Sequence, residues 1–466
     1  MRICLVHLCL LALLSGTVPN AKAASEALTA APLRALETDG NGDQRLALHS
    51  VVPGGPRPEV EITLLPAQTL QRWDGVGAAL TDSAATVLAG MPAASRTALL
   101  QRLFDPRLGG LNLVRLTIGA SDFSASGPYT YEQRPGAFDF THELKAIVPI
   151  LHEVKRLQPN LRLLAAPWSP PGWMKLSGQL NGGLVAPTSY PDLAEYLVRF
   201  AQQYRDWGLP IDLLSVQNEP QLSRDDYPTA LLPSPEEARL VHDYLVPALR
   251  RSDLENVGIL GLDHNWSDLP YARTLAASPA ASDLAGYAFH CYRGDPSTMA
   301  LLRPLLRPGQ TLLTTECTPT RGGGFAQGFR YTMKTLVMGT VLNGGSGVVM
   351  WNLALDPSGG PRLGGCQNCM GVVTVQPGSV VTYDPSFYAL AQVAGAVRPG
   401  ASVITARSSA ADVLAAAFRN PDRSVAVIAY NAGATTHRIG LFLGGQTFGY
   451  TLPPNAAVTL SNDTGD

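Results

Sequence analysis

Two apolar, strand-like runs of the sequence each end at a glutamate. Leu213 to Gln217 is followed by Asn218 and Glu219, and Thr311 to Thr315 is followed directly by Glu316. Each run would deliver a carboxylate to the mouth of whatever sheet these strands build. Two carboxylates at one mouth can supply acid-base and nucleophilic chemistry for the cleavage of a glycosidic bond.

The chain between positions 71 and 352 alternates short β-type runs with longer amphipathic segments. Eight strands, each followed by a helix or a long loop, predict an α/β fold, a closed (β/α)8 barrel of the TIM type. An open doubly wound sheet is the alternative, but no G-x-G-x-x-G motif follows the first strand. The predicted strands are 73–77, 111–118, 161–166, 211–217, 257–262, 286–290, 311–315 and 347–351, and helix-like segments include 142–156, 191–207, 235–250 and 325–342.

The tail of the chain departs from this alternation. From about position 397 it contains β-runs at 402–406, 411–418, 424–430, 437–440 and 456–460, separated by turn sequences, with no helix among them. We therefore predict an accessory all-β sandwich, completed by strands that precede the barrel. The predicted divisions are a signal peptide over 1–23, an N-terminal segment of the side domain over 24–68, a catalytic barrel over 69–396 and a C-terminal β-sandwich over 397–466.

The first residues have the pattern of a secretory signal. Arg2 supplies a positive charge, Leu5 to Leu14 is apolar apart from one histidine, and the sequence Ala-Lys-Ala at 21–23 suits a signal peptidase. The apolar stretch is too short to span a membrane. We therefore expect cleavage after Ala23 and a secreted or periplasmic protein with no transmembrane segment.

Charge and composition exclude some classes of partner. The full chain has 35 Lys and Arg against 37 Asp and Glu, and removal of Arg2 and Lys22 leaves 33 against 37, a net charge of −4. A nucleic-acid-binding protein would carry a basic stripe instead, so no nucleic-acid partner is expected. A content of 45% hydrophobic residues is not that of a disordered chain.

Four cysteines remain once the signal is removed. An oxidising compartment permits disulfides, and Cys366 and Cys369 are near enough in sequence to bridge locally. A zinc knuckle is the alternative, but it needs more ligands than one C-x-x-C motif supplies, so no metal site is expected. Cys291 and Cys317 are interpreted as two small buried hydrophobes or as a bridge between the sixth and seventh strands.

Polar and aromatic residues concentrate where the predicted strands end. In a parallel barrel the active site forms at these carboxyl ends, because the βα loops gather there. Any single residue could be a structural polar group or a core aromatic, whereas the whole set on one face favours a site. The set is Asp82, Arg115, Trp168, Asn218, Glu219, His290, Tyr292, Glu316, Trp351 and Asn352.

Five motifs follow one another over roughly residues 70 to 360. They are W-D-G-V-G-A-A-L-T-D-S-A-A at 73–85, Arg115 with S-D-F-S at 121–124, A-P-W-S-P-P-G-W-M-K at 166–175, Q-N-E-P at 217–220 and W-N-L-A-L-D at 351–356. In this order they resemble the motifs of the glucosylceramidase-like enzymes of glycoside hydrolase family 30, and the β-tail resembles the side domain of that family. An isolated Asn-Glu-Pro occurs in many barrel glycosidases, but the ordered series is specific.

The resemblance implies a retaining hydrolysis in two steps. Glu219 matches the general acid/base of the family and Glu316 matches its nucleophile, which in retaining enzymes lie roughly 5 Å apart. Glu219 would then need to hold a proton near the working pH, and burial beside a like charge is expected to raise its pKa. Arg115 is expected to keep Glu316 ionised.

The other site residues are assigned by the same resemblance. Asp82 and Trp168 resemble ligands for sugar hydroxyls, and Trp351 resembles the aromatic floor on which a sugar stacks. Asn218 would hold the 2-hydroxyl, a contact that strengthens in the transition state. Tyr292 would lie beside the nucleophile, and His290 would act as a supporting hydrogen-bonding group.

The resulting hypothesis is an exported, cofactor-free retaining β-glycosidase that acts on β-glucosides, with a carbohydrate or glycolipid substrate. Within the family, the alternative is an endo-acting β-1,6-glucanase, xylanase or galactanase. Outside it, the alternatives are a catalytically inactive carbohydrate-binding barrel and a metal-dependent barrel hydrolase. The loop G-G-C-Q-N-C-M at 364–370 departs from the human-type glucosylceramidase pattern, so the identity of the sugar stays open.

Overall fold

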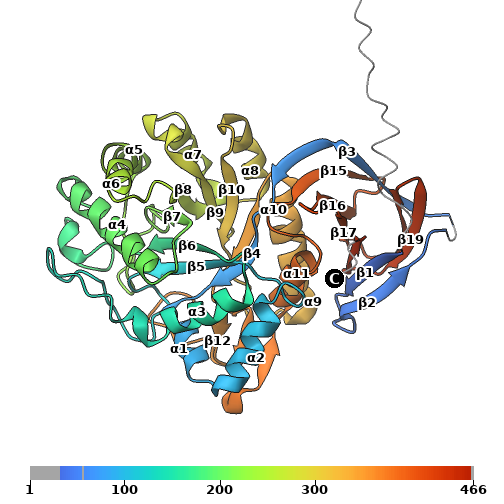
Figure 1. Cartoon of the computed structure of the whole chain (residues 1–466), viewed down its shortest axis with the longest axis horizontal. Helices are drawn as coiled ribbons and strands as arrows, with labels where there is room; N and C mark the ends of the chain where they lie inside the picture. Colours follow the sequence, from blue (N-terminus) through green and yellow to red (C-terminus); the bar gives the residue numbers. More distant parts are fainter. Residues whose placement is uncertain (1–31, 55–56, 463–466) are drawn as a thin grey trace, which may run out of the picture.

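The computed structural model describes residues 32–54 and 57–462. A barrel surrounded by helices stands beside a β-sandwich (Figure 1). The predicted signal peptide and its cleavage point after Ala23 lie outside the described residues. In the part of the chain that the structure describes, the helices are too short or too polar to cross a bilayer.

Eight parallel strands close into a barrel in chain order, so the predicted (β/α)8 barrel is confirmed. Nearly all strand residues are buried, because helices cover the outside and side chains fill the inside. The strands are β4 (Gly75–Ala79), β5 (Leu113–Ile118), β6 (Arg162–Pro167), β7 (Leu213–Ser215), β8 (Gly258–Asn265), β9 (Leu284–His290), β10 (Thr311–Glu316) and β11 (Gly347–Met350).

The helices around the barrel bury one apolar face each. In α3 (Ile147–Leu157), Ile147, Ile150, Leu151 and Val154 are buried, at the three- and four-residue spacing of a helix face. The predicted segments 235–250 and 325–342 are continuous helices with a central π-helical stretch. The remaining helices are α1 (Asp82–Ala89), α2 (Ala93–Phe104), α4 (Tyr190–Asp206), α5 (Ser234–Arg239), α6 (Val246–Arg251), α7 (Leu269–Ala276), α8 (Ser297–Leu302), α9 (Gly324–Arg330), α10 (Gly339–Leu342) and α11 (Pro385–Ala394).

The sandwich combines strands from both ends of the described chain, as predicted. Its strand order is β19-β18-β3-β15-β16-β17-β20-β1-β2. The sequence analysis missed β19, although Gly444 and Gly445, both with positive φ, form the two-residue turn that joins it to β18. The strands are β1 (Leu33–Thr38), β2 (Arg45–Val51), β3 (Val60–Arg72), β15 (Ser402–Ser408), β16 (Val413–Arg419), β17 (Val425–Asn431), β18 (His437–Leu443), β19 (Gln446–Leu452) and β20 (Ala457–Ser461).

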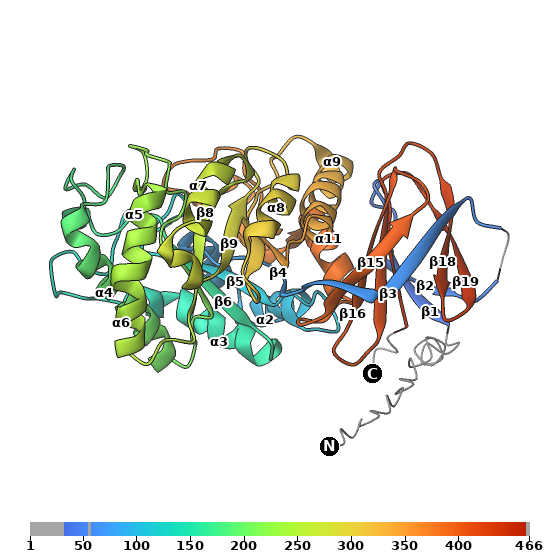
Figure 2. The same ribbon diagram turned by 90° about the horizontal axis from the view of Figure 1, so that it is seen from above.

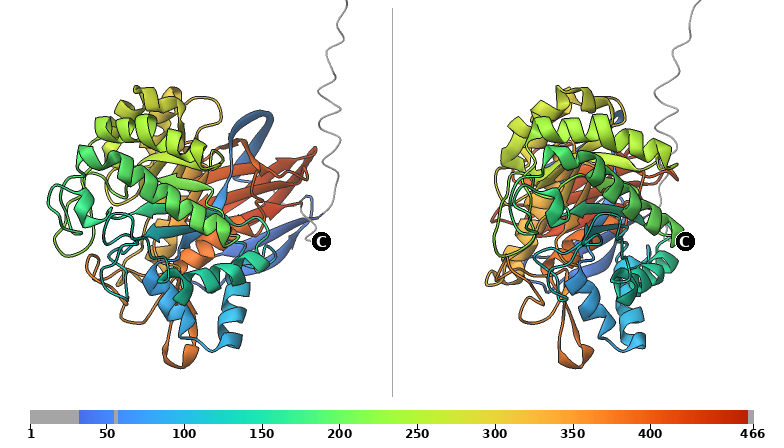
Figure 3. Two further views of the ribbon diagram at one scale, coloured as in Figure 1. Left: turned by 60° about the vertical axis from the view of Figure 1, so that its left-hand side comes forward. Right: turned by 90° about the vertical axis from the view of Figure 1, so that its left-hand side faces the viewer.

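Strand β3 and helix α11 connect the barrel to the sandwich (Figure 2). β3 runs out of the sandwich and leads directly into β4, and every residue of α11 is buried. The side chain of Gln392 on α11 bonds Thr38 of β1 and Thr459 of β20. The sandwich keeps its place at one end of the barrel in a view turned by 60° (Figure 3).

After β11, a small sheet of β12 (Ala354–Leu355), β13 (Val373–Val375) and β14 (Val381–Tyr383) supports the long loop near the barrel mouth.

Candidate active site

The two glutamates predicted from strand ends lie together at the mouth of the barrel. Glu219 follows β7 and Glu316 is the last residue of β10. A carboxylate oxygen of each and a ring nitrogen of His290 all lie within 4.8 Å of one another. The Glu219 backbone has a φ of 46°, a left-handed conformation that is strained for a residue other than glycine. This strain is typical of residues whose side chains are held for function.

Arg115 and Tyr292 hold the carboxylate of Glu316. Nη1 of Arg115 lies 2.5 Å from Oε2 of Glu316, and the hydroxyl of Tyr292 donates to Oε1 at 2.8 Å. Burial lowers the pKa of Arg115, but the charges of Asp263 and Glu316 outweigh burial and raise it. Burial and the charge of Glu316 raise the pKa of Tyr292, so its hydroxyl keeps the proton that it donates. Each carboxylate oxygen of Glu316 therefore accepts from one fixed donor.

His290 bridges Glu219 and a third carboxylate, Asp263. Its Nδ1 lies 3.1 Å from Oε1 of Glu219, and its Nε2 lies 3.1 Å from Oδ1 of Asp263. Burial lowers the pKa of His290, but Glu316, Asp263 and Glu219 together raise it to about 10. Burial raises the pKa of Glu219, yet the hydrogen bond and charge of His290 outweigh burial and lower it.

This outcome differs from the expectation that the pKa of Glu219 is raised. In the free site, the raised pKa of His290 and the lowered pKa of Glu219 favour the proton of their hydrogen bond on the imidazole. Two groups that interact this strongly titrate as a pair. The sequence motif could not reveal this, because the charge that acts on Glu219 comes from a different strand.

Asp263, at the end of β8, is a site residue that the sequence analysis missed. A β-bulge occurs between Leu262 and His264 where β8 pairs with β9, and it turns the Asp263 side chain toward the site. Oδ2 accepts from Nη2 of Arg115 at 2.8 Å, and Oδ1 accepts from the Thr315 hydroxyl at 2.7 Å. The Asp263 carbonyl accepts the Glu219 N–H at 3.0 Å. Asp263 therefore contacts Arg115, which holds Glu316, and His290, which bonds Glu219.

A signal for Asp263 was present in the sequence. The strand predicted at 257–262 was the only one of strands two to eight without an assigned residue at its end, and the chain continues there with Asp-His-Asn. The other polar groups of the site could be predicted because they follow the carboxyl ends of the predicted strands. Asn218 accepts from Nη2 of Arg115 at 2.8 Å.

Aromatic rings line a pocket of about 280 Å³ above the glutamates. Trp168 and Trp351 stack with their ring centroids 4.9 Å apart, and the guanidinium carbon of Arg115 lies 4.8 Å from the Trp168 centroid. Tyr227 and Tyr292 line the same pocket. Faces of this kind suit the apolar face of a sugar ring.

Asp122 also lines the pocket and was not assigned from sequence. Burial and the charges of Glu316 and Glu219 raise its pKa well above the ordinary value. Its Oδ1 is buried without a hydrogen-bond partner among the described residues. A buried polar atom of this kind at a pocket wall is available to a ligand hydroxyl.

Asp82 does not line this pocket. Its carboxylate accepts from the backbone N–H and the hydroxyl of Ser126, at 2.9 and 3.2 Å, and Nε2 of His142 lies 3.3 Å away. The structure thus gives Asp82 protein partners, and a sugar contact at Asp82 stays a prediction.

All four cysteines of the described residues form disulfides. Cys291 pairs with Cys317, and Cys366 pairs with Cys369. The second disulfide lines the active-site pocket. Its loop is fixed at three places: Leu363 N–H donates to the Asp122 carbonyl, Gly365 N–H donates to the Asp226 carboxylate, and Arg321 N–H donates to the Asn368 carbonyl.

Among the described residues, Glu219, His290 and Glu316 are the group whose ligand atoms converge as a metal site requires. Their nearest neighbours do not suit a cation. Arg115 already places its positive charge on Glu316, and both ring nitrogens of His290 already face carboxylates. The donor set therefore fits acid-base chemistry better than metal binding.

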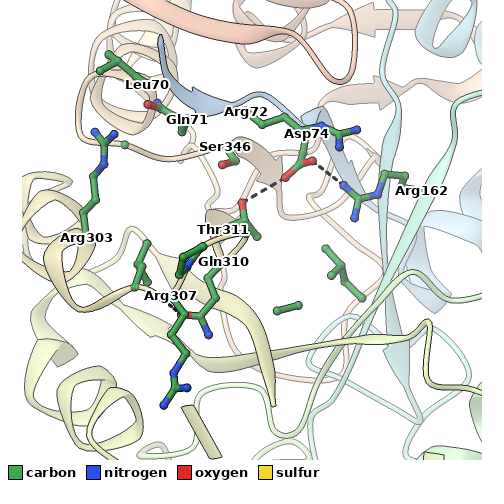
Figure 4. A pocket seen from close by; sticks show the side chains of 16 residues that line it. Leu70, Gln71, Arg72, Asp74, Arg162, Arg303, Arg307, Gln310, Thr311 and Ser346 are labelled. Carbon is green, nitrogen blue, oxygen red and sulfur yellow. Dashed lines mark hydrogen bonds and ion pairs between the residues drawn. The ribbon is translucent and has the colours of Figure 1, made fainter. Parts of the chain in front are cut away.

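A larger hollow of about 890 Å³ lies at the opposite end of the barrel, where the strands begin (Figure 4). Arg72, Arg162, Arg303 and Arg307 surround it, and Asp74 pairs with Arg162 at 2.8 Å and with the Thr311 hydroxyl at 3.2 Å. No pair of carboxylates faces this hollow. Of these two hollows, the one at the carboxyl ends of the strands holds the carboxylate pair that glycosidic chemistry needs.

Comparison with known proteins agrees with this geometry. The chain matches the glycosyl hydrolase family 30 TIM-barrel domain over residues 73–396 and the glycosyl hydrolase family 30 beta sandwich domain over residues 395–460. Endo-1,6-beta-D-glucanase neg1 of Aspergillus fumigatus is 32% identical over 416 residues, which cover 83% of this chain and 84% of that protein.

Two further proteins are similar over most of their length. Lysosomal acid glucosylceramidase of Mus musculus is 27% identical over 407 residues, 79% of this chain and 77% of that protein. A solved endo-beta1,6-glucanase has a TM-score of 0.86 at 29% identity. The match covers 92% of this chain and 99% of the solved chain. With a carboxylate pair at the mouth of the barrel and both domain models matched, the chain belongs to glycosyl hydrolase family 30 and is a glycoside hydrolase.

Proposed function

We propose that the protein cleaves β-1,6-glucosidic bonds with retention of configuration, with Glu316 as nucleophile and Glu219 as general acid/base. The observation that carries this proposal is the approach of their carboxylate oxygens to within 4.8 Å. Retaining enzymes hold the two groups roughly 5 Å apart, whereas inverting enzymes leave room for a water molecule between them. The hydrogen bonds from Arg115 and Tyr292 fix the position of the Glu316 carboxylate, which supports its role as nucleophile.

In the first step, Glu316 attacks the anomeric carbon and Glu219 protonates the departing oxygen. The proton shared by His290 and Glu219 passes to that oxygen through Glu219, which is 3.1 Å from Nδ1 of His290. Formation of the glycosyl ester removes the charge of Glu316. In the second step Glu219 takes a proton from water, which attacks the ester and releases the sugar.

Asn218, Asp122 and the stacked Trp168 and Trp351 rings would bind the sugar at the cleaved bond. Trp351 would supply the floor and Asn218 the contact to the 2-hydroxyl, as the family resemblance implies. The unpartnered Oδ1 of Asp122 would bond a further hydroxyl. Because these groups surround the nucleophile, they can strengthen their contacts as the ring flattens toward the transition state.

The choice of β-1,6-glucan over a glucosylceramide rests on similarity. The Aspergillus fumigatus relative, at 32% identity, and the solved neighbour, at 29%, are both named as endo-1,6-glucanases, whereas the mouse glucosylceramidase is 27% identical. The loop with Cys366 and Cys369 also departs from the glucosylceramidase pattern. The glucosylceramidase-like specificity first expected therefore becomes the second choice, behind the endo-acting β-1,6-glucanase that was the alternative.

Incubation with linear β-1,6-glucan tests this proposal. We expect a mixture of short oligosaccharides whose new reducing ends are first released as the β anomer, observed by proton NMR before mutarotation. Release of the α anomer would contradict retention. Turnover of aryl β-glucosides or glucosylceramide without turnover of β-1,6-glucan would contradict the proposed substrate, while leaving the roles of the two glutamates in place.

We also infer that the protein is exported. The signal-like residues 1–23 and the two disulfides both suit an oxidising compartment. Mass spectrometry of the protein recovered from the medium or periplasm of expressing cells is expected to find an N-terminus at Ala24. An intact Met1 on protein that remains in the cytoplasm would contradict the inference.

A further inference from the structure

Glu237 is a buried carboxyl group behind the active site that no step above uses. It lies on α5, is 1% exposed, and points toward β8. Its Oε1 accepts the backbone N–H of Leu262 at 3.1 Å, and its Oε2 lies 2.5 Å from the hydroxyl of Tyr271 on α7. Leu262 is the residue just before the bulge that carries Asp263.

The bulge is a strained piece of backbone. Leu262 has a φ of 74° and Asp263 a φ of 50°, so two consecutive residues with side chains adopt left-handed conformations. Next to the bulge, the buried Leu262 N–H donates to a side chain, the carboxyl group of Glu237, at 3.1 Å.

The contacts of Tyr271 accommodate a protonated Glu237. The Tyr271 hydroxyl lies 2.6 Å from the Leu232 carbonyl oxygen and 2.5 Å from Oε2 of Glu237. A hydroxyl has one proton and can donate to only one of these oxygens. If Tyr271 donates to Leu232, the second contact needs a proton on Glu237, which then donates to Tyr271.

The surroundings of Glu237 favour this protonated form. Burial raises its pKa to about 7 against the hydrogen bonds of Tyr271 and Leu262, which lower it, and the negative charge of Asp263 acts in the same direction as burial. The groups that face it from other elements are Tyr271 of α7, Asp263 of β8 and Tyr287 of β9, and none of them is a cation. Tyr271 keeps its own proton, because burial and Glu237 raise its pKa.

We propose that Glu237 is a positioning residue, whose protonated carboxyl group holds the Leu262 bulge and thereby aims Asp263 at Arg115 and His290. This proposal rests on the proposed function, because Asp263 matters through the two glutamates. Loss of the Glu237 proton would leave the Leu232 carbonyl without its donor and would place a second negative charge behind Asp263. The bulge would then relax, and Arg115 and His290, which contact Asp263, would shift with it.

Three variants test the proposal. Glu237→Gln keeps the shape and donates to Tyr271 as the protonated acid does, so its kcat on β-1,6-glucan should stay within about twofold of wild type below pH 6. Glu237→Ala should lower kcat by about tenfold to a hundredfold with little change in KM, since a small displacement of catalytic groups costs rates of that size. Glu236→Gln is the control, because Glu236 is on the same helix and bonds Tyr190 instead.

The pH profile separates this role from a merely structural one. Wild-type activity should fall as Glu237 ionises near pH 7, whereas Glu237→Gln has no proton to lose there and should stay active to higher pH. If the activities of wild type and Glu237→Gln fall at the same alkaline pH, the proposal is wrong. A kcat for Glu237→Ala equal to that of wild type would also overturn it.

Thermal unfolding provides a test that needs no substrate. The pKa of Glu237 is raised from 4.5 to about 7 on folding, so its stabilising contribution is complete below about pH 4.5 and is lost as the pH rises through 7. The Tm of wild type should therefore fall relative to that of Glu237→Gln over this interval. Parallel curves of Tm against pH for wild type and Glu237→Gln would reject a protonated Glu237. A wild type that does not cleave β-1,6-glucan would instead contradict the proposed function.

Discussion

Replacing Glu316 by glycine is expected to reduce turnover of β-1,6-glucan by roughly 10⁶-fold, the loss observed when a covalent nucleophile is removed. Added azide should restore cleavage of an activated aryl β-glucoside, because the small anion fits the space left by the side chain. Azide would attack from the face that Glu316 occupied. The expected product is therefore the α-glucosyl azide, identified by proton NMR.

The fold should survive this substitution. Arg115 would lose one carboxylate but keep Asp263, 2.8 Å away, and Tyr292 lies at the edge of the pocket. Circular dichroism and the Tm would verify this. Glu195→Ala is a matched control, since Glu195 is an exposed glutamate that pairs with Arg199 on the barrel surface. A folded Glu316→Gly protein that yields no glucosyl azide, or yields only the β anomer, would refute the assignment of Glu316 as nucleophile.

Glu219→Ala is expected to slow hydrolysis of β-1,6-glucan by about 10³ to 10⁴-fold, within the range attributed to general acid-base catalysis. A dinitrophenyl β-glucoside, whose leaving group needs no proton, should still form the glycosyl ester on Glu316. Azide would then intercept that ester from the opposite face. The product expected here is the β-glucosyl azide, the anomer opposite to that from Glu316→Gly.

The comparison of two leaving groups makes this test specific. If Glu219 only held the structure together, both substrates would slow by the same factor, and azide would leave the product unchanged. Either result would contradict the acid/base role. The imidazole of His290 stays bonded to Asp263 in this variant, so its position need not change.

Much of the architecture could be predicted from the sequence, because local patterns carry it. The eight barrel strands are short apolar runs bounded by turns, and their positions follow from hydrophobic periodicity alone. Glu219 and Glu316 could be found because each directly follows such a run, and in a closed parallel barrel all strand ends share one mouth. The β-tail was recognised in the same way, except for β19, whose Gly-Gly turn was overlooked.

The protonation and support of the site were decided by tertiary structure. Asp263 reaches Arg115 and His290 only because β8 bulges against β9, and a bulge depends on strand pairing, which leaves no pattern in a single strand. The pKa of Glu219 is lowered, contrary to expectation, since its strongest opposing charge, His290, comes from another strand. Asp82 found partners in Ser126 and His142, and Asp122 faced the pocket instead.

The sequence by itself therefore determined the barrel, the sandwich and the two glutamates, because residues close together in the chain encode them. Only the tertiary structure decided which neighbours surround those glutamates and how His290 shifts the pKa of Glu219. Hydrogen bonds and charges act over a few ångströms in space, and the groups involved lie on strands that are distant in the chain. Glu237, which supports the bulge from a helix behind the site, depends on the same kind of contact.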